Sequence, residues 1–482
     1  MRTVQGLLSF VLLLCLPTLA SSTPKLPDTA PARLLSGWLE AFNSGDAARL
    51  TDFIARHYSD SERQGGSPEQ QAEREIAFRN AADGGFDLLA IEKSTPQTVE
   101  VIFGEKNGMA FWRALFQVDS AHPTIIEHTE FRPASPPRGL RRKLTLQQLT
   151  ASLDTKLVQR TANDRFSGVV LIAKDGRPVW QKAYGSLDRA KNVNNAIDTK
   201  FRLASQNKMF TAIAIAQLVE AGKLKFSDTV AQLLTDYPNQ EIAKRVTVHH
   251  LLTHTSGIAD FVGPEFRRDP GRYRKDSDFL PLFADKPLGF EPGSKFRYSN
   301  GGFVVLGLII EKITGQSYYD YMKRNVFDPA GMMDAGFTPT GEQDARIAVG
   351  YTRRGRNGPM ALRDSSETLP GRGMSALGCE GTASDLLAFG NALLAGKLVS
   401  KKMGRTLTQT KVNNEQEGGG YGYGFATSEM FGHSVFGHAG TWAGMNTDLL
   451  IVPDTGYTIV VLSNLDPPAA QQVSAYIASS LL

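Results

Sequence analysis

Apolar residues recur along the chain with periods that distinguish helices from strands. Residues 32–42 (ARLLSGWLEAF) repeat them at helical spacing, and Asp46 can cap a second helix that runs through Tyr58. Strand-like runs follow at residues 86–93, 98–103, 110–118 and 124–131. Helices followed by a meandering sheet predict a compact α+β domain over residues 30–132.

The pattern changes after residue 143. A helix is predicted over residues 144–160, followed by strands at 166–173 and 178–184 around the turn Lys174-Asp175-Gly176. The end of the chain mirrors this start, with strands predicted at 445–452 and 457–464 and a helix at 469–482. We therefore expect an α/β domain over residues 144–482, in which both ends build one antiparallel sheet and the helices between them form a subdomain. The active site should lie where the two meet.

Two further segments stand outside these domains. An apolar stretch at residues 7–16 follows a single positive charge and ends near Ala20, which predicts a secretory signal peptide over residues 1–20. An uncleaved membrane anchor is the alternative. Residues 133–143 concentrate prolines and basic side chains and predict a linker. The expected location is periplasmic or extracellular.

Composition refines this picture only slightly. A chain of 482 residues exceeds one ordinary domain, and 41% hydrophobic with 21% charged residues is typical of a folded protein. The net charge of +4 is spread along the chain, which argues against a nucleic-acid partner. Cys15 falls in the predicted signal, so Cys379 would stand alone in the exported protein.

The sharpest chemical signal is the pattern S-x-x-K formed by Ser205 and Lys208 at the start of an apolar helix ending near Gly222. The spacing places the hydroxyl and the amine on one helix face. A serine needs a neighbouring base, and a lysine in a dry environment can supply it. Alone, the pattern is equally compatible with a helix cap beside a solvated lysine.

Two later patterns add context. Tyr298 and Asn300 form Y-x-N, which offers a phenol for proton transfer and an amide that can orient a substrate or the lysine. His438-x-Gly440 stands just before the penultimate strand, where the glycine lets a backbone approach a ligand and Thr441 can offer its N–H. Taken singly, the Y-x-N pair also fits an ordinary turn.

In this order, the three motifs resemble the serine β-lactamase and penicillin-binding-protein superfamily, and most closely its class C β-lactamase-related serine hydrolases. The phrases VTVHHLLTHTSGI (residues 246–258) and SALGCEGTASDLLAF (residues 375–389) support the resemblance. It implies that Ser205 is the nucleophile and that Lys208 and Tyr298 move its proton.

The same resemblance places further residues at the substrate. It implies an oxyanion hole built from the N–H groups of Ser205 and Thr441, with Asn300, His438 and Gly440 beside the substrate. His438 departs from the lysine that β-lactamases carry there, and a mostly neutral histidine would hold a carboxylate less firmly. This favours esters, amides or peptides with other termini over β-lactams.

The predicted function is an exported serine hydrolase that forms an acyl-enzyme with ester, amide or D-amino-acid peptide substrates and needs no cofactor. A β-lactamase or D-Ala-D-Ala carboxypeptidase is one alternative, and a non-catalytic cell-wall-binding protein is another. The expected partner is a small-molecule or short-peptide substrate, with contact to the cell wall or to a second copy left open.

Other candidate residues point less clearly to chemistry. His249, His250 and His254 lie close together, but no cysteine joins them, and no metal is predicted. Cys379 is expected to be a small buried hydrophobic residue. The phrase WLEAFNSGDAARL (residues 38–50) resembles NTF2-like domains, which implies either a cone that holds a ligand or a partner copy, or a simple spacer.

Overall fold

The computed structural model describes residues 24–134, 137, 143–342, 344–354, 361–414 and 419–482. By internal contacts the chain divides into two units, residues 1–140 and 141–482. The predicted signal peptide (residues 1–20) lies outside the described residues, as does most of the predicted linker (residues 133–143). The linker prediction was wrong at its start. Pro133 and Ala134 belong to the last strand of the first unit, on a sheet edge where proline is tolerated.

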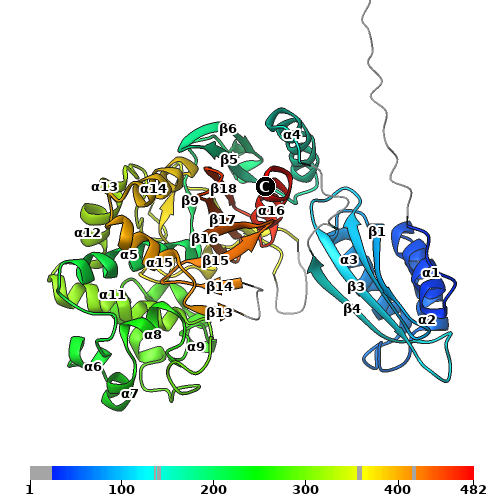
Figure 1. Ribbon diagram of the computed structural model, residues 1–482, viewed down its shortest axis with the longest axis horizontal. Coiled ribbons are helices and arrows are strands. Elements are labelled where there is room, and N and C mark those ends of the chain that lie inside the picture. Colours follow the sequence, from blue (N-terminus) through cyan, green and yellow to red (C-terminus); the bar gives the residue numbers. More distant parts are fainter. Residues whose placement is uncertain (1–23, 135–136, 138–142, 343, 355–360, 415–418) are drawn as a thin grey trace, which may run out of the picture. The chain divides into compact units, whose positions relative to one another are not determined.

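The first unit has three helices among the described residues, followed by a sheet (Figure 1). The helices are α1 (Ala30–Ser44), α2 (Ala47–His57) and α3 (Pro68–Ala81). The strands of the sheet are β1 (Phe86–Ser94), β2 (Thr98–Glu105), β3 (Phe111–Val118) and β4 (Ile126–Ala134). The strands pair in chain order and antiparallel. The α+β prediction is confirmed. Helix α3 was not predicted because its sequence is largely polar, and Ser67 starts it with a capping box to Gln70.

Aromatic side chains fill the core of the first unit. The ring of Phe42 stacks on Trp38 at 4.5 Å and on Phe86 at 5.3 Å, and Phe86 stacks on Phe103 at 5.2 Å. The buried Trp38 also donates its indole N–H to the carboxylate of Glu75, 2.7 Å away on α3. This bond ties the largely polar helix to the apolar core, which explains why α3 forms without a strong apolar stripe of its own.

The second unit is built on a sheet in the order β13-β14-β15-β16-β17-β18-β5-β6, antiparallel throughout. Its strands are β5 (Gly168–Lys174), β6 (Arg177–Tyr184), β13 (Val412–Asn414), β14 (Gly419–Tyr421), β15 (Ala426–Met430), β16 (His433–Trp442), β17 (Met445–Val452) and β18 (Tyr457–Ser463). The two ends of the unit meet where β18 pairs with β5. The predicted antiparallel sheet built by both ends is therefore confirmed.

Side-chain alternation gives the central strands two buried faces. On β18, Val460 and Leu462 face the large core shared with the helical subdomain, and Ile459 and Val461 lie outside that core. Helices α4 (Leu146–Ala162) and α16 (Ala469–Leu481) cover the second face (Figure 1). Among the described helices, none is both long enough and apolar enough to cross a bilayer.

The subdomain on the other face contains the helices that carry the candidate chemistry. They include α5 (Asn207–Glu220), α8 (Val248–Leu252), α10 (Asp276–Phe279), α11 (Asn300–Thr314), α12 (Tyr318–Met322), α14 (Ala383–Ala395) and α15 (Lys401–Thr408). Helices α6 (Val230–Leu233), α7 (Gln240–Arg245), α9 (Pro264–Arg268) and α13 (Asp328–Ala330) complete them. Helix α5 is buried over most of its length and packs against α11. A nearly uniformly apolar helix of this kind belongs in the centre of a core.

Candidate active site

Ser205 lies in a short 3₁₀ turn, Ala204–Gln206, directly before α5. The residue before it, Ala204, has a φ of +47°, a left-handed conformation that is uncommon for a residue with a side chain. Such a conformation persists only where the surroundings enforce it. Leu203 supplies part of that enforcement, since its N–H donates to the carbonyl of Cys379 at 2.7 Å.

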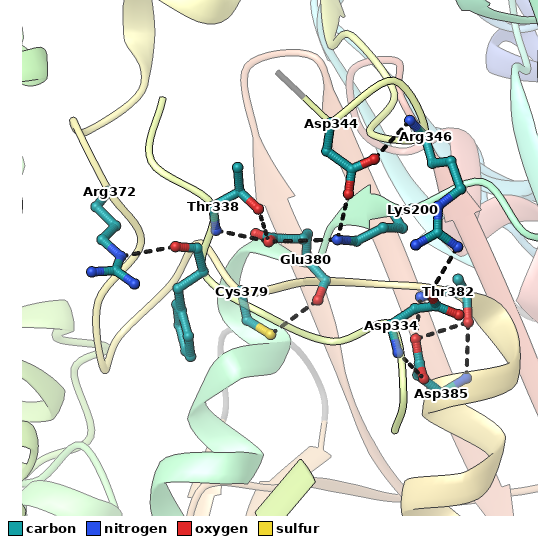
Figure 2. Close-up of polar contacts among 11 residues, drawn as sticks. Lys200, Asp334, Thr338, Asp344, Arg346, Arg372, Cys379, Glu380, Thr382 and Asp385 are labelled. Atoms are coloured by element: carbon teal, nitrogen blue, oxygen red, sulfur yellow. Dashed lines mark hydrogen bonds and ion pairs between the residues drawn. The ribbon is translucent and has the colours of Figure 1, made fainter. Parts of the chain in front are cut away.

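Charged contacts anchor the strand that leads into this turn. Strand β9 (Phe201–Arg202) pairs with β12 (Glu380–Gly381), and Lys200 immediately precedes β9. Figure 2 shows the Lys200 Nζ reaching Asp344, at 2.9 Å, and the fully buried Glu380, at 3.8 Å. Glu380 also accepts hydrogen bonds from the N–H and the hydroxyl of Thr338, at 2.7 and 2.6 Å. The segment entering the nucleophile turn is therefore held from several directions.

Lys208 is fully buried three residues after Ser205. Its Nζ lies 3.3 Å from Ser205 Oγ, 2.7 Å from Asn300 Oδ1 and 2.8 Å from the carbonyl oxygen of Ala376. Burial lowers the pKa of Lys208 to about 7, and the negative charge of Asp260 acts in the opposite direction. The amine can therefore lose its proton near neutral pH while it stays within reach of the serine.

Asn300, the first residue of α11, orients this amine. Its N–H and its side-chain Nδ2 both donate to Asp260 Oδ2, at 2.9 and 3.0 Å, so its Oδ1 must face Lys208. An amide with both ends engaged has a fixed orientation. Of the two roles open for Asn300, this geometry fits the orientation of the lysine.

Tyr298 lies over the same amine. Its ring centroid is 4.7 Å from the Lys208 Nζ, and its ring contacts that of His254 with the centroids 4.2 Å apart and the planes tilted by 32°. His254 is fixed in turn, because its Nδ1 accepts the N–H of Ser299 at 3.1 Å. Burial, with the charge of Lys208 acting in the same direction, holds the pKa of His254 well below its usual value. A neutral imidazole thus supports the phenol.

Strand β16 packs directly against the nucleophile turn. A methyl group at Gly440 would lie 2.1 Å from the carbonyl oxygen of Leu203, so only glycine permits this approach. The hydroxyl of Thr447 donates to that carbonyl at 3.1 Å, and the side chain of Gln206 donates to the carbonyl of His438 at 3.0 Å. Thr441, next on β16, is exposed beside the turn.

His438 has both ring nitrogens engaged. Nδ1 lies 2.6 Å from the carbonyl oxygen of Ala439, which can only accept, so Nδ1 carries the proton. Nε2 then accepts the hydroxyl of Tyr421 at 2.9 Å. Burial, with the charge of the nearby Lys208 acting in the same direction, lowers the pKa of His438 to about 3. His438 is therefore a neutral side chain that is already hydrogen-bonded, and it offers no cation for a carboxylate.

The other histidines of this region lie apart from the serine. His249 Nδ1 is 2.8 Å from the hydroxyl of Tyr423, and His250 Nδ1 accepts the N–H of Thr247 at 3.2 Å. Within the described residues, no group of three or more His, Cys, Asp or Glu side chains is arranged to hold a metal ion. Cys379 is buried, and burial raises the pKa of its thiol.

The structure thus brings together every predicted site residue, on elements far apart in the chain. Ser205 lies in the turn before α5 and Lys208 in the first turn of α5. Tyr298 lies two residues before α11, Asn300 begins that helix, and the remaining three come from β16. The sequence prediction missed Asp260 and the roles of His254 and Tyr421. His254 and Asp260 both belong to the phrase HTSGIAD (residues 254–260), which the sequence displays. The contacts of these two side chains with Tyr298 and Asn300 become visible only in the structure.

Comparison with known proteins agrees with this arrangement. Residues 153–481 match the family model described as Beta-lactamase. The chain belongs to the β-lactamase family. Its relatives include the esterase EstB of Burkholderia gladioli, 31% identical over 67% of this chain and 92% of EstB.

Solved structures place this β-lactamase-family chain in the same group. A penicillin-binding protein from Bacillus halodurans is 34% identical, with a TM-score of 0.60, over 66% of this chain and 98% of that one. A D-stereospecific amidohydrolase from Streptomyces sp. is 26% identical, with a TM-score of 0.58, over 67% of this chain and 97% of that one. The predicted fold and the assignment as a serine hydrolase are confirmed.

Proposed function

We propose that this protein is an exported serine hydrolase that cleaves esters, amides or D-amino-acid peptides through an acyl-enzyme on Ser205. One observation carries the proposal: the buried Lys208 amine, with a pKa near 7, lies 3.3 Å from the serine hydroxyl. A weakly basic amine at that distance is suited to remove the hydroxyl proton as the oxygen attacks a carbonyl.

The first half-reaction forms the acyl-enzyme. Lys208 takes the proton of Ser205 as Oγ bonds to the substrate carbonyl carbon, and the carbonyl oxygen gains the negative charge. The N–H groups of Ser205 and Thr441 would hold that oxygen, since β16 lies against the nucleophile turn. The proton then passes by way of Tyr298 to the leaving alcohol or amine as its bond to carbon breaks.

The second half-reaction releases the acyl group. A water molecule gives a proton to Lys208 and Tyr298 and attacks the carbonyl carbon of the acyl-enzyme. The proton then returns to Ser205 Oγ as its bond to the acyl group breaks. The ring contact with His254 keeps Tyr298 in position. No redox or metal step is needed for either half.

The neutral, hydrogen-bonded imidazole of His438 favours the proposal that the substrates lack a carboxylate next to the reacting bond. The imidazole is neutral, and its Nε2 is occupied by Tyr421. A β-lactam or a peptide ending in a free carboxylate would find no cation at this position. The β-lactamase and D-Ala-D-Ala carboxypeptidase alternatives are therefore less favoured, although the penicillin-binding-protein relatives keep them open to test.

Labelling by a fluorophosphonate tests the nucleophile. We expect the wild-type protein to react and to hydrolyse p-nitrophenyl esters, and Ser205→Ala to do neither while its circular dichroism is unchanged. Ser428→Ala, at an exposed serine of β15, is the matched control and should react like the wild type. Labelling that persists in Ser205→Ala would refute the assignment. A wild type that is never labelled would favour the non-catalytic cell-wall-binding alternative.

A matched substrate pair tests the substrate class. The rates on a D-aminoacyl-D-alanine peptide and on its C-terminal amide should differ by at least about tenfold in favour of the amide, because no cation faces the carboxylate. Rapid turnover of the free acid, or of a chromogenic cephalosporin, would instead identify a carboxypeptidase or a β-lactamase.

Export and the role of the first unit are further parts of this proposal. The apolar stretch at residues 7–16 supports cleavage near Ala20, and N-terminal sequencing of protein from the periplasm or the medium would test it. A retained N-terminus in the membrane fraction would favour the anchor. The NTF2-like resemblance of the first unit, and contact with the cell wall or a second copy, stay predictions.

A further inference from the structure

Three consecutive carbonyl groups converge on the buried side of α5. The carbonyl oxygens of Met374 and Ser375 both accept from Asn207 Nδ2, each at 2.9 Å. The Ser375 carbonyl also accepts from Thr211 Oγ1 at 2.7 Å, and the Ala376 carbonyl accepts from Lys208 Nζ at 2.8 Å. The segment Met374–Leu377, a tight turn closed by two backbone hydrogen bonds, is named the carbonyl turn.

The carbonyl turn sets the direction of the lysine lone pair. A neutral amine has two N–H bonds and one lone pair in tetrahedral directions. Two acceptors, Asn300 Oδ1 and the Ala376 carbonyl, take the two N–H bonds. The remaining direction, that of the lone pair, is left for Ser205 Oγ at 3.3 Å. If the Ala376 carbonyl moves, the amine can rotate and the lone pair is no longer aimed at the serine.

Asp276 holds the carbonyl turn from the side opposite α5. Its Oδ1 accepts the N–H of Ser375 at 3.2 Å and lies 2.6 Å from Ser375 Oγ, whose hydroxyl also has the carbonyl oxygen of Phe303 within reach at 2.8 Å. Asp276 is the first residue of the short helix α10 and only 3% exposed. It does not touch Ser205 or Lys208 through any hydrogen bond between the described residues. Its effect on the site must therefore pass through the turn.

Helix α11 is shaped to admit this carboxyl group. A methyl group at Gly307 would lie 2.4 Å from Asp276 Oδ2 and 2.5 Å from Ser375 Oγ. The glycine thus allows the Asp276–Ser375 pair to lie directly against the helix that begins with Asn300. Helix α11 therefore positions Asn300, one acceptor of the Lys208 amine. It also makes room for Asp276, which supports the turn that carries the other acceptor, the Ala376 carbonyl.

We propose that Asp276 is a positioning residue for the hydrolase reaction, which aims the Lys208 amine at Ser205 by holding the carbonyl turn. The inference rests on the proposed function. The residue lies 68 positions after Lys208 and outside all three motifs, and it would act without contact to substrate.

The ionisation of Asp276 supports this role. Burial, with smaller contributions from Glu311 on α11 and Asp278 on α10, raises the pKa of Asp276 to about 8, although its hydrogen bonds to Ser375 act in the opposite direction. Tyr318 and Tyr319 of α12 also face it; burial raises the pKa of both phenols, and the Asp276 carboxyl acts in the same direction. At neutral pH Asp276 is thus mostly a neutral acid that accepts from Ser375, and asparagine can imitate that form.

Two substitutions of Asp276 and one control test the inference. Asp276→Ala should lower kcat on a p-nitrophenyl ester at least about tenfold with KM within twofold, and should slow fluorophosphonate labelling in parallel, because the base is misdirected. Asp276→Asn should keep most of the activity at pH 7. The control Asp448→Ala removes a similarly buried Asp–Ser pair, with Ser474, on the α16 face of the sheet. It should leave kcat unchanged.

The outcomes separate the inference from the proposed function. Equal loss of kcat in Asp276→Ala and Asp448→Ala would show a general effect of destabilisation and overturn the inference. If Asp276→Ala does not fold, Ser375→Ala decides, because it removes the hydroxyl that is hydrogen-bonded to Asp276. We expect kcat to fall several-fold with KM within twofold, and an unchanged kcat would overturn the inference. A wild type that is never labelled would overturn the proposed function itself, and the inference with it.

Discussion

Lys208 and Asn300 are 92 positions apart in the sequence, yet the amine of one lies 2.7 Å from the amide oxygen of the other. This contact joins the first turns of α5 and α11, the two helices that directly follow the serine and the tyrosine. Because the amide is itself fixed by Asp260, the lysine is held by a partner that cannot turn away. The reactivity of Ser205 therefore depends on how two helix starts are packed together.

The protonation state of Lys208 should control the acid side of the pH profile. Since the base must be neutral, kcat/KM should rise as pH increases through about 7, the pKa that burial gives this amine. Lys208→Arg should lose activity at every pH up to 9, because a guanidinium does not deprotonate in this range. The measurement is ester hydrolysis from pH 5 to 9. An unchanged profile in the arginine variant would mean that another group is the base.

Asp260 should tune that pKa while it fixes Asn300. Its negative charge raises the pKa of Lys208, so Asp260→Asn should move the acid side of the profile to lower pH. The asparagine oxygen can still accept from Asn300, and kcat at pH 8 should fall only a few-fold. Asp260→Ala removes this acceptor, and we expect a loss of at least about tenfold. A shift to higher pH in Asp260→Asn would contradict the assigned charge effect.

Gly440 should be intolerant of any side chain. The added methyl group of Gly440→Ala would collide with the Leu203 carbonyl and the Thr447 hydroxyl, and β16 would have to move away from the nucleophile turn. We expect a loss of about 100-fold in kcat, because the N–H of Thr441 moves with the strand. Gly263→Ala, where the nearest atom is 3.9 Å from the added carbon, is the control and should keep full activity. Full activity in Gly440→Ala would show that this close approach is not needed.

Asp448 should make the stability of the second unit depend on pH. Burial raises its pKa to about 6, above the unfolded value, so its ionisation opposes folding. The contribution of Asp448 to the free energy of unfolding is most favourable below pH 4 and is lost as pH rises through about 6. The side chain of Asp448→Asn cannot ionise. The free energy of unfolding of this variant, minus that of the wild type, should therefore be larger at pH 8 than at pH 4 by on the order of 2 kcal/mol. Thermal unfolding at the two pH values measures this, and a difference that does not change with pH would be the contrary result.

The sequence predicted the frame of the second unit because the relevant signals are local. The strand at residues 445–452 and the start of the final helix at residue 469 match β17 and α16, since short apolar runs bounded by turn residues mark them. Helix α3 was missed for the opposite reason. Its few apolar positions give no stripe, and what stabilises it includes a buried hydrogen bond to Trp38 that only the folded unit forms.

The site shows the same division. Ser205, Lys208, Tyr298 and Asn300 stand in short motifs whose spacing carries meaning. Asp260 and Asp276 act through hydrogen bonds that span 40 and 99 positions, to Asn300 and to Ser375, and no local pattern marks them. His438 was found by its motif, but its neutral, occupied state depends on Tyr421 on a separate strand. Local sequence patterns do not show which distant side chains will form hydrogen bonds with each other in the folded protein.

The pairing of β18 with β5 has a consequence for how the protein is made. The hydroxyl of Ser463 donates to the carbonyl of Ser167, 296 positions earlier, so the centre of the sheet joins the first and last parts of the unit. Contacts of such high sequence separation slow folding. During synthesis, the hairpin of β5 and β6 is complete long before β18 exists, and one of its edges stays unpaired. An unpaired edge invites aggregation, so a chaperone that shields residues 168–174 until the last helix emerges would raise the yield of active enzyme.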